Sequence, residues 1–311
     1  MAPFTVTKEL VAEANDVLLR TLLEKLLEAE ARQSGIPLAS IAVGGNQTAA
    51  DGGVDGSIEW EGDPEPTGWL PRRAIFFQSK AEVMAAARLK KEIRPKDVVR
   101  PIFDELAAKQ GAYIVFSTDD PSKSAYDERI SAMTEMLADV ADGDAVLLDF
   151  CGADKIARWT NSHRGVAIWL LGELGRPLGG WRPYGDWSAP GAHAQPYLFD
   201  DTARVEIDGV TMSIRDGLIA MRKLLSAPGG AVRLIGPSGM GKTRLAEALF
   251  DDRFDPATAL VSSLAIYGDA GLELAVGPAL VAEQLAVSSI AAIIVVDCPP
   301  SAFNRQTGCM K

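Results

Sequence analysis

The sequence predicts an α/β protein of two domains joined by a linker. Its 311 residues are enough for two domains of ordinary size. Short apolar strands alternate with amphipathic helices along the chain, and a stretch rich in proline and glycine separates two such series. We therefore expect an N-terminal αβ domain over residues 1–175, a linker over 176–200, and a second domain with a parallel sheet over 201–311.

The composition excludes several classes of protein. Hydrophobic residues make up 47% of the chain and charged residues 23%, which argues against global disorder or a collagen-like chain. With 31 basic and 42 acidic residues the net charge is −11, so binding of nucleic acid requires a local basic patch or a bound metal. Three scattered cysteines, no signal peptide and no apolar stretch long enough to cross a membrane predict a soluble cytoplasmic protein without disulfides.

The first domain is expected to begin with a long helix. Residues 6–34 carry leucine and valine at helical spacing, with lysine and glutamate on the other face. Pro95 is expected to break a later helical region. The expected strands are residues 38–43, 74–79, 112–117 and 145–150, and further helices are expected at 124–141 and 156–174.

The linker and the second domain follow. Four prolines and several glycines between residues 175 and 200 indicate a linker, and Trp181, Tyr184 and Trp187 indicate that it packs on a domain. The second domain is expected to contain a hairpin at 203–211, helices at 213–225, 242–250 and 278–286, and strands at 232–235, 259–265 and 291–296. This βαβ alternation predicts a parallel sheet.

The segment GPSGMGKT, Gly236–Thr243, fits the phosphate-binding loop pattern G-x-x-x-x-G-K-[ST]. Its glycines allow backbone N–H groups to surround phosphate oxygens at a helix N-terminus. Lys242 is expected to reach the β- and γ-phosphates of ATP and Thr243 to bind Mg²⁺, while Asp297, which ends an apolar strand, supplies the Walker B carboxylate. The residues expected to bind nucleotide are Gly236, Ser238, Gly239, Gly241, Lys242, Thr243 and Asp297.

Two departures from hydrolytic P-loop proteins bear on ATPase activity. Cys298 follows Asp297 where an acidic residue often stands, and only 14 residues remain after Asp297. The strand that lies between the P-loop and Walker B strands in related ATPase cores is missing, so residues 201–311 are expected to be the N-terminal part of an NTPase domain. The chain is then the front part of a larger protein or a naturally shortened one, and the sequence leaves ATP hydrolysis open.

A second candidate site combines the turn DGGVDG with the strand end FQSK. Residues i and i+2 of a strand face the same side, so Gln78 and Lys80 are both expected to face Asp55. Asp55 would bind a divalent metal, Gln78 would position metal or water, and Lys80 would orient the nucleophilic water and offset phosphorane charge. Glu24 of the opening helix, with Glu28 as second choice, would complete the catalytic and metal-binding set. The alternative is a glycine-rich hairpin with an exposed aspartate.

With the long helix before it and the strands and helices after it, this pattern resembles the Mrr-like branch of the PD-(D/E)xK restriction-endonuclease fold. The resemblance implies Mg²⁺- or Mn²⁺-dependent, non-specific cleavage of double-stranded DNA. The order of nuclease-like domain, linker and GPSGMGKTRLAEALF resembles bacterial antiphage defence proteins of the STAND NTPase type. In that family an effector is joined to a P-loop NTPase and a C-terminal sensor, which is absent here. The likeness implies that target binding and ATP drive homo-oligomerisation, which switches on DNA degradation.

Two alternatives to this function remain open. The protein could be a modification-dependent restriction endonuclease, or a non-catalytic NTP-binding interaction module with a degenerate nuclease fold. A basic segment either contacts phosphates or is a solvated helix face; it contains Arg88, Lys90, Lys91, Arg94, Lys96 and Arg100. Asp119 and Asp120 are expected to start a turn, and His163 to cap a helix or lie at the surface.

Overall fold

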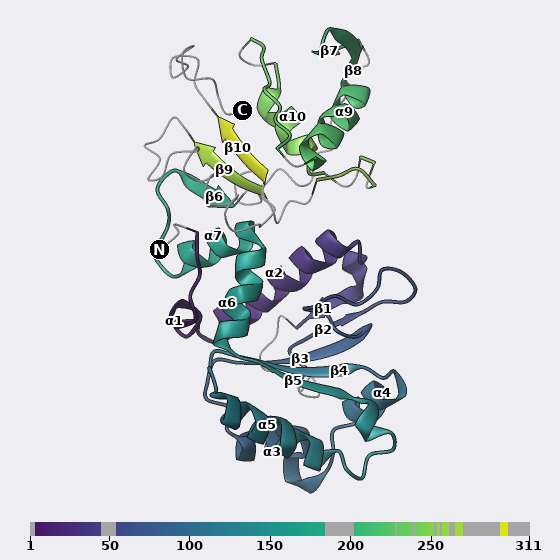
Figure 1. The fold of residues 1–311 in the computed structure, drawn as a ribbon, viewed down its shortest axis with the longest axis vertical. Coiled ribbons are helices and arrows are strands. Elements are labelled where there is room, and N and C mark those ends of the chain that lie inside the picture. Colours follow the sequence, from purple (N-terminus) through teal and green to yellow (C-terminus); the bar gives the residue numbers. More distant parts are fainter. Residues whose placement is uncertain are drawn as a thin grey trace. The chain divides into compact units, whose positions relative to one another are not determined.

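A computed structural model of the chain describes residues 4–44, 54–183, 202–227, 229–237, 240–251, 254–255, 257–260, 265–269 and 293–297. The chain divides into two compact units, Pro3–Arg176 and Pro177–Lys311 (Figure 1). Both units mix helices with strands, so the predicted α/β class is confirmed. No helix in the described part of the chain is long and apolar enough to span a membrane.

Unit 1 is built on a five-stranded mixed sheet in the order β1-β2-β3-β4-β5. The strands are β1 (Ile41–Val43), β2 (Gly56–Glu59), β3 (Ala74–Lys80), β4 (Ala112–Ser117) and β5 (Leu147–Cys151). The pairs β1–β2 and β2–β3 are antiparallel, whereas β3–β4 and β4–β5 are parallel. The carboxyl ends of β3, β4 and β5 therefore meet at one edge of the sheet, and β2 begins at that same edge.

Helices cover both faces of this sheet (Figure 1). One face carries α1 (Lys8–Val11), α2 (Asp16–Ser34), α6 (Ala153–Ser162) and α7 (Arg164–Glu173). The other face carries α3 (Ala86–Ile93), α4 (Ile102–Ala108) and α5 (Lys123–Met136). Phe76 of β3 and Tyr113 of β4 lie side by side on this face of the sheet. They pack in one core cluster with Leu89, Phe103 and Met133 of these three helices.

The long helix predicted over residues 6–34 is two helices. Asn15 separates them, because its side chain accepts a hydrogen bond from the Leu18 backbone N–H and so caps the start of α2. Gly35 ends α2 in the left-handed conformation, with φ of 75°. The predicted helix over 156–174 is also interrupted, at His163, between α6 and α7. The predicted break at Pro95 is confirmed, since α3 ends at Ile93.

Unit 2 contains a three-stranded sheet in the order β10-β9-β6. Its strands are β6 (Trp181–Pro183), β9 (Ala265–Asp269) and β10 (Ile293–Asp297). β9 and β10 are parallel, as the βαβ pattern predicts, and β6 is antiparallel to β9. Part of the segment predicted to be a linker is therefore a strand, in which buried Trp181 lies against Gly268; a Cβ there would lie 2.9 Å from the indole ring.

Three predictions for unit 2 are corrected or fall outside the described residues. Of the strand predicted over 259–265, only Ala265 belongs to β9, residues 259–260 are not in a strand, and 261–264 lie outside the described residues. Residues 232–235, predicted as a strand, form neither strand nor helix, and the Ile235 side chain is 79% exposed. A strand before the phosphate loop would need to bury such side chains between parallel neighbours. The helix predicted over 278–286 lies outside the described residues.

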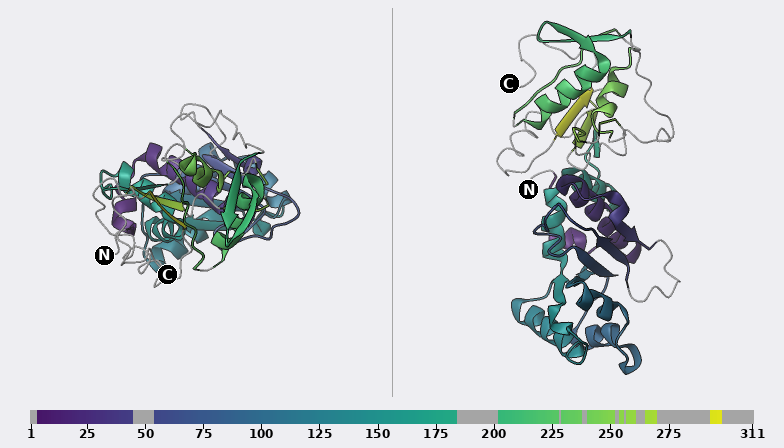
Figure 2. Two further views of the ribbon diagram at one scale, coloured as in Figure 1. Left: turned by 90° about the horizontal axis from the view of Figure 1, so that it is seen from above. Right: turned by 90° about the vertical axis from the view of Figure 1, so that its right-hand side faces the viewer.

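The rest of unit 2 is a hairpin and two helices (Figure 2). The hairpin pairs β7 (Arg204–Ile207) with β8 (Val210–Ser213), close to its predicted position, and its turn places Asp208 and Gly209 at positive φ. It leads into α9 (Ile214–Ser226), and α10 (Lys242–Ala248) follows the phosphate loop.

Arg222 of α9 is fully buried and fastens the two helices together. Its guanidinium donates to the carbonyl oxygens of Ala248 at 2.8 Å, Leu249 at 3.0 Å and Asp251 at 2.7 Å. These carbonyls lie at the C-terminal end of α10 and have no partner inside that helix, so Arg222 acts as its cap.

Candidate functional site

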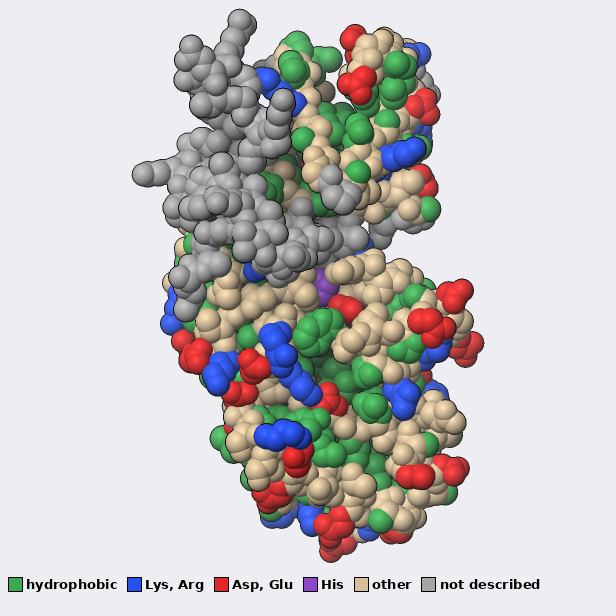
Figure 3. Space-filling model, viewed as in Figure 1, with side chains coloured by type: hydrophobic (Ala, Val, Ile, Leu, Met, Phe, Trp, Pro, Cys, Tyr) green, Lys and Arg blue, Asp and Glu red, His purple; other side chains and the backbone are tan. Residues whose placement is uncertain are grey.

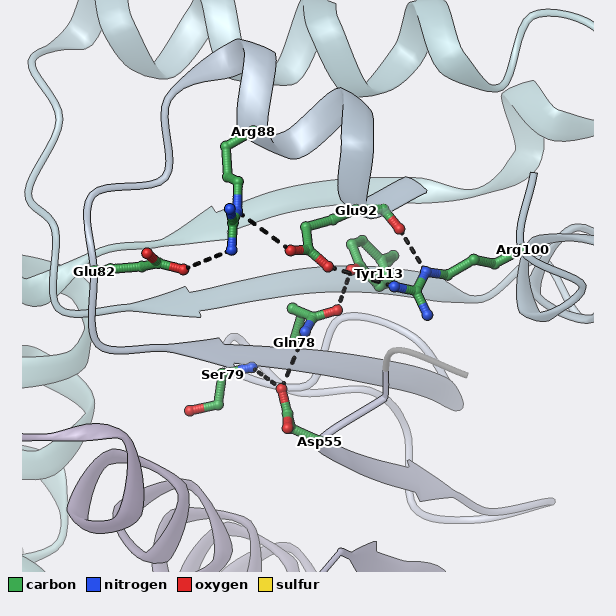
Figure 4. A network of polar contacts seen from close by, with 8 residues as sticks. All are labelled: Asp55, Gln78, Ser79, Glu82, Arg88, Glu92, Arg100 and Tyr113. Carbon is green, nitrogen blue, oxygen red and sulfur yellow. Dashed lines mark hydrogen bonds and ion pairs between the residues drawn. The ribbon is translucent and has the colours of Figure 1, made fainter. Parts of the chain in front are cut away.

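The candidate site lies at the carboxyl edge of the unit 1 sheet, where β2 begins and β3 ends. Asp55 immediately precedes β2, and its backbone N–H donates to the Phe77 carbonyl oxygen of β3 at 2.8 Å. Because β2 and β3 are antiparallel, this pairing places Asp55 beside Gln78 (Figure 4). The structure thus brings together two of the residues that the spacing predicts to meet.

The Asp55 carboxylate is buried, with 5% of the residue exposed, and each of its oxygens has a donor. Oδ2 accepts hydrogen bonds from the Gln78 side-chain amide at 3.2 Å and from the Ser79 backbone N–H at 2.8 Å. Oδ1 forms an ion pair with the Arg20 guanidinium of α2. These donors compensate the loss of water around a buried carboxylate.

Gln78 is held at both ends of its amide. Its nitrogen donates to Asp55, and its oxygen accepts a hydrogen bond from the Tyr113 hydroxyl of β4 at 3.0 Å (Figure 4). Burial, followed by the nearby Glu92 carboxylate, raises the pKa of Tyr113 above its ordinary value. The hydroxyl therefore stays protonated at neutral pH and can continue to donate.

Lys80 ends β3 two residues after Gln78 and is half-buried. Among the residues that the structure describes, its ammonium group has neither an ion pair nor a hydrogen bond. The next residue, Ala81, donates its backbone N–H to the Asp16 carboxylate at 2.8 Å, so the N-terminus of α2 also reaches this strand end. Lys80 is therefore a cation at the edge of the site, without a carboxylate partner among the described residues.

Glu24 and Glu28 are both exposed on α2, and within the described part of the chain neither forms a hydrogen bond or ion pair with Asp55, Gln78 or Lys80. The α2 residue that contacts Asp55 is Arg20, which sequence reasoning missed. Arg20 lies one turn before Glu24 on the same face of α2, but no local pattern in the sequence marks it as the partner of Asp55. Within the described ranges, no group of three or more His, Cys, Asp or Glu side chains is arranged to hold a metal ion.

The donor set at Asp55 fits a magnesium or manganese ion only in part. Carboxylate and amide oxygens are the hard ligands that these ions prefer. Here, however, Arg20 occupies one Asp55 oxygen, and Gln78 presents its nitrogen to the other. A cation could bind between Asp55 and Gln78 only if the guanidinium left and the amide presented its oxygen.

The basic segment of α3 and the following loop is largely paired with carboxylates. Arg88 bridges Glu82 at 3.2 Å and Glu92 at 3.5 Å, and Arg100 also pairs with Glu92 (Figure 4). Lys90 pairs with Glu135, and Arg94 pairs with Asp139. These pairings leave Lys91 and Lys96 as the cations of this segment for which the described residues provide no partner.

The two aspartates after β4 are paired as well. Asp119 forms an ion pair with buried Arg129, and its carbonyl oxygen accepts from the Ala153 N–H at the start of α6. Asp120 pairs with Lys8 at 2.8 Å. Both contacts tie elements together at the strand end, where the backbone bends at Thr118 but residues 119–122 form no turn, contrary to expectation.

Of the two positions expected for His163, the structure places it at the cap between α6 and α7, without a capping hydrogen bond from its side chain, and completely buried rather than at the surface. Its Nε2 lies 3.0 Å from Oε2 of Glu30, a buried carboxylate on α2 that also accepts from the Thr67 hydroxyl at 2.7 Å and the Trp159 indole N–H at 3.4 Å. Burial raises the pKa of Glu30, but the hydrogen bonds from His163, Thr67 and Trp159 outweigh it, so the pKa is lowered overall. This buried polar cluster links α2 to the junction of α6 and α7.

A hollow of about 180 Å³ opens on the face of the sheet that carries α6 (Figure 3). Phe77 contributes to its floor, so it lies across the sheet from Gln78, because consecutive strand residues face opposite sides. Its wall includes Trp159 stacked on Trp69, with ring centroids 5.7 Å apart. Lys155 and Asp149, both in the lining, are paired with each other at 2.7 Å.

The phosphate loop of unit 2 has its lysine folded back on the loop. The Lys242 ammonium group donates to the carbonyl oxygens of Gly236 at 2.9 Å and Pro237 at 2.8 Å. Gly241 has a φ of 76°, which favours glycine, and precedes the first residue of α10; Thr243 is the second. Asp297 ends β10, and Ser238 and Gly239 lie outside the described residues.

Comparison with known proteins adds no family to these observations. No family model matches the chain, and neither the curated proteins nor the solved structures provide a match.

Proposed function

We propose that residues 1–175 form a metal-dependent DNA endonuclease of the PD-(D/E)xK, Mrr-like type. We further propose that residues 201–311 form an ATP-binding switch of the STAND type, and that the protein acts in bacterial antiphage defence by degrading DNA on activation. The contact between Asp55 and Gln78 at the carboxyl edge of the sheet, with Lys80 two residues further along β3, is the observation that carries the proposal.

The order of elements supports the same fold. A long helix, α2, precedes three strands joined in antiparallel fashion, and β3 is followed by a helical segment and by the parallel strands β4 and β5. Asp55 and Lys80 then lie where strand ends converge, which is where α/β sheets commonly bind ligands.

In the proposed reaction each residue has a separate part. A bound Mg²⁺ or Mn²⁺ would polarise the scissile phosphate and make water a better nucleophile. Asp55 would hold the cation, and Gln78, whose amide donates to the Asp55 carboxylate, would position the metal or the water. Lys80, which has no partner in the described part of the chain, is available to orient the attacking water and to offset charge on the phosphorane.

The phosphate loop supports ATP binding. Lys242 needs to exchange two loop carbonyls for phosphate oxygens, and Gly241 gives the loop its left-handed turn into α10. By the proposal, ATP favours a homo-oligomer that brings nuclease units together, with double-stranded DNA as substrate.

A second function is favoured by a specific observation. Asp55 is saturated by Arg20, Gln78 and Ser79, and no cluster of three metal-binding side chains is found within the described residues. Those features suit a non-catalytic, NTP-binding interaction module in which the nuclease fold has lost its chemistry.

Plasmid cleavage separates the two functions. The purified chain is incubated with supercoiled plasmid and Mg²⁺ or Mn²⁺, with and without ATP, beside the variants Lys80→Ala and Lys109→Ala. Lys109 is the matched control, because it pairs with Glu59 and Glu105 on the unit 1 surface. Metal-dependent cutting that is lost in Lys80→Ala and kept in Lys109→Ala is expected. Equal cutting by all three proteins, or none at any ATP concentration, would contradict the nuclease proposal.

A further inference from the structure

Arg20 occupies the position at Asp55 where a cation would bind. Its Nη2 pairs with Oδ1, and the two side chains are only 16% and 7% exposed. A buried carboxylate needs a positive charge or several donors, and here the guanidinium provides the charge. The electrostatic role of a metal ion at Asp55 is thus filled by a residue of the same chain.

The fit of Arg20 at this position is incomplete. A guanidinium can grip a carboxylate with two parallel N–H bonds, but only one Arg20 nitrogen is paired with Asp55. Arg20 Nε is buried without a hydrogen-bond partner within the described structure, and so is the hydroxyl of Ser79, whose own N–H contacts Asp55. Buried polar groups without partners cost free energy, so this arrangement is easier to displace than a fully bonded one.

Gln78 can adapt to either occupant. Its amide nitrogen faces Asp55 while the carboxylate accepts, and its oxygen faces Tyr113. A hydroxyl both donates and accepts, so Tyr113 can bond either end of the amide. If a cation replaced the guanidinium, the amide could turn over, direct its oxygen to the cation and give its nitrogen to Tyr113.

We propose that Arg20 is a placeholder for a divalent cation at Asp55, so that Mg²⁺ or Mn²⁺ binds only when the guanidinium leaves. The inference rests on the proposed function in taking Asp55 as the metal ligand, and it deepens it by naming what regulates that site. The apparent affinity of Asp55 for the cation then equals its intrinsic affinity multiplied by the fraction of molecules in which Arg20 does not occupy Asp55. Arg20 thereby keeps the site closed at low cation concentration.

Binding of Mn²⁺, followed by the electron paramagnetic resonance signal of the free ion, tests this directly in the full chain. Asp55→Asn, made in each background, identifies the component due to Asp55 and separates it from Mn²⁺ held elsewhere. Arg20→Gln is expected to bind Mn²⁺ at Asp55 at least about tenfold more tightly than wild type, as for a site that is free in a tenth of molecules or fewer. Lys25→Gln is the matched control, because Lys25 also lies on α2 but sits over the Trp169 ring, 4.8 Å from its centroid.

A change of less than about twofold in Arg20→Gln would overturn the inference, since the vacated site would bind no better. An equal gain in Lys25→Gln would do the same, because any lost positive charge would then suffice. Arg20→Gln leaves Asp55 buried without its cation, so its folding is measured by circular dichroism with and without Mn²⁺. If it unfolds without the ion, Mn²⁺ is expected to restore the folded spectrum; a variant that stays unfolded at saturating Mn²⁺ overturns the inference.

The outcome is independent of the nuclease test. Plasmid cleavage by wild type together with unchanged Mn²⁺ affinity in Arg20→Gln would refute the placeholder and leave the nuclease. Tight Mn²⁺ binding by Arg20→Gln without cleavage by any variant would refute the nuclease and leave the placeholder.

Discussion

Removal of the Glu30 carboxylate should destabilise unit 1, because two buried donors lose their acceptor. In Glu30→Ala, the Trp159 indole N–H and His163 Nε2 lose their acceptor in a site that solvent does not reach. Each buried orphan costs about 1–3 kcal/mol, while the half-buried Thr67 hydroxyl can turn to water. Because Glu30→Ala also removes a buried negative charge, part of this cost is offset, and the free energy of unfolding should fall by about 3 kcal/mol in all. In a domain of this size that corresponds to a fall of about 10 °C in the melting temperature.

Tryptophan fluorescence during thermal and urea unfolding measures the effect, because Trp159 belongs to the cluster. Glu28→Ala is the matched control: Glu28 is exposed two residues earlier on the same helix, so its loss should change stability by no more than about 0.5 kcal/mol. If the two variants melted within about 2 °C of each other, the reasoning on buried acceptors would be wrong.

The same variant predicts a pH dependence. The pKa of Glu30 in the folded chain is below its ordinary value of 4.5, since hydrogen bonds to the carboxylate outweigh burial. A depressed carboxyl pKa stabilises the folded state fully above the unfolded pKa, and this contribution disappears as pH falls through the folded pKa. The difference in unfolding free energy between wild type and Glu30→Ala should be constant from pH 7 to about pH 5 and shrink below about pH 4. A difference that grew on acidification would refute the assigned direction.

Three further predictions concern packing, reactivity and the capping arginine. Gly111→Ala should lower the free energy of unfolding, measured in urea, by about 1–3 kcal/mol, because its Cβ would lie 2.6 Å from a leucine methyl and 2.7 Å from a backbone carbonyl oxygen. Gly172→Ala, whose Cβ would have nothing within 4 Å, should be neutral or stabilising, and equal effects of the two changes would contradict this reasoning. Burial raises the pKa of the Cys151 thiol to about 12, so alkylation of Cys151 at pH 8, followed by peptide mass spectrometry, should be slow until the protein is unfolded, and fast labelling of the native chain would count against its burial. Arg222→Met should speed hydrogen exchange in α10, because the Ala248 and Leu249 carbonyl oxygens at its C-terminal end each lose one of their two donors. Arg233→Met serves as an exposed control, and unchanged exchange in Arg222→Met would show that the cap is dispensable.

Strands β3 and β4 could be predicted because their apolar runs are compact and buried on both faces. AYIVFS is β4 to the residue, and AIFFQS falls one residue short of β3. Strand β2 was not predicted, and of the strand expected over 38–43 only Ile41–Val43 is a strand, because Leu38–Ser40 form a 3-10 turn. The apolar run at residues 232–235 failed as a strand, since a local pattern does not show whether a neighbouring strand is there to pair with it. The prediction of a linker at Trp181 was wrong in the opposite sense, since this residue lies in strand β6. The partner strand β9 lies far along the chain, so the proline-rich surroundings of Trp181 suggested only a linker.

The candidate site was predictable where it depends on strand geometry. Asp55 and Gln78 meet because Asp55 immediately precedes β2, which pairs antiparallel with β3, and the alternation along β3 that places Gln78 on this face is a local feature of the sequence. Arg20 and His163 were not predictable in the same way. Arg20 reaches Asp55 over 35 residues, and His163 reaches Glu30 over 133 residues, so tertiary packing decides these contacts.

The Arg222 cap has a mechanical consequence for unit 2. The side chain bonds α9 to the end of α10, and the β7–β8 hairpin packs closely on α9, where a Cβ on Gly217 would collide with Val205. Helix α9, the C-terminal end of α10 and the hairpin are therefore joined by packing and hydrogen bonds. The start of α9 lies about 12 Å along the helix from Arg222, at 1.5 Å per residue. A rotation of α9 by about 10° about Arg222 would therefore shift the base of the hairpin by about 2 Å.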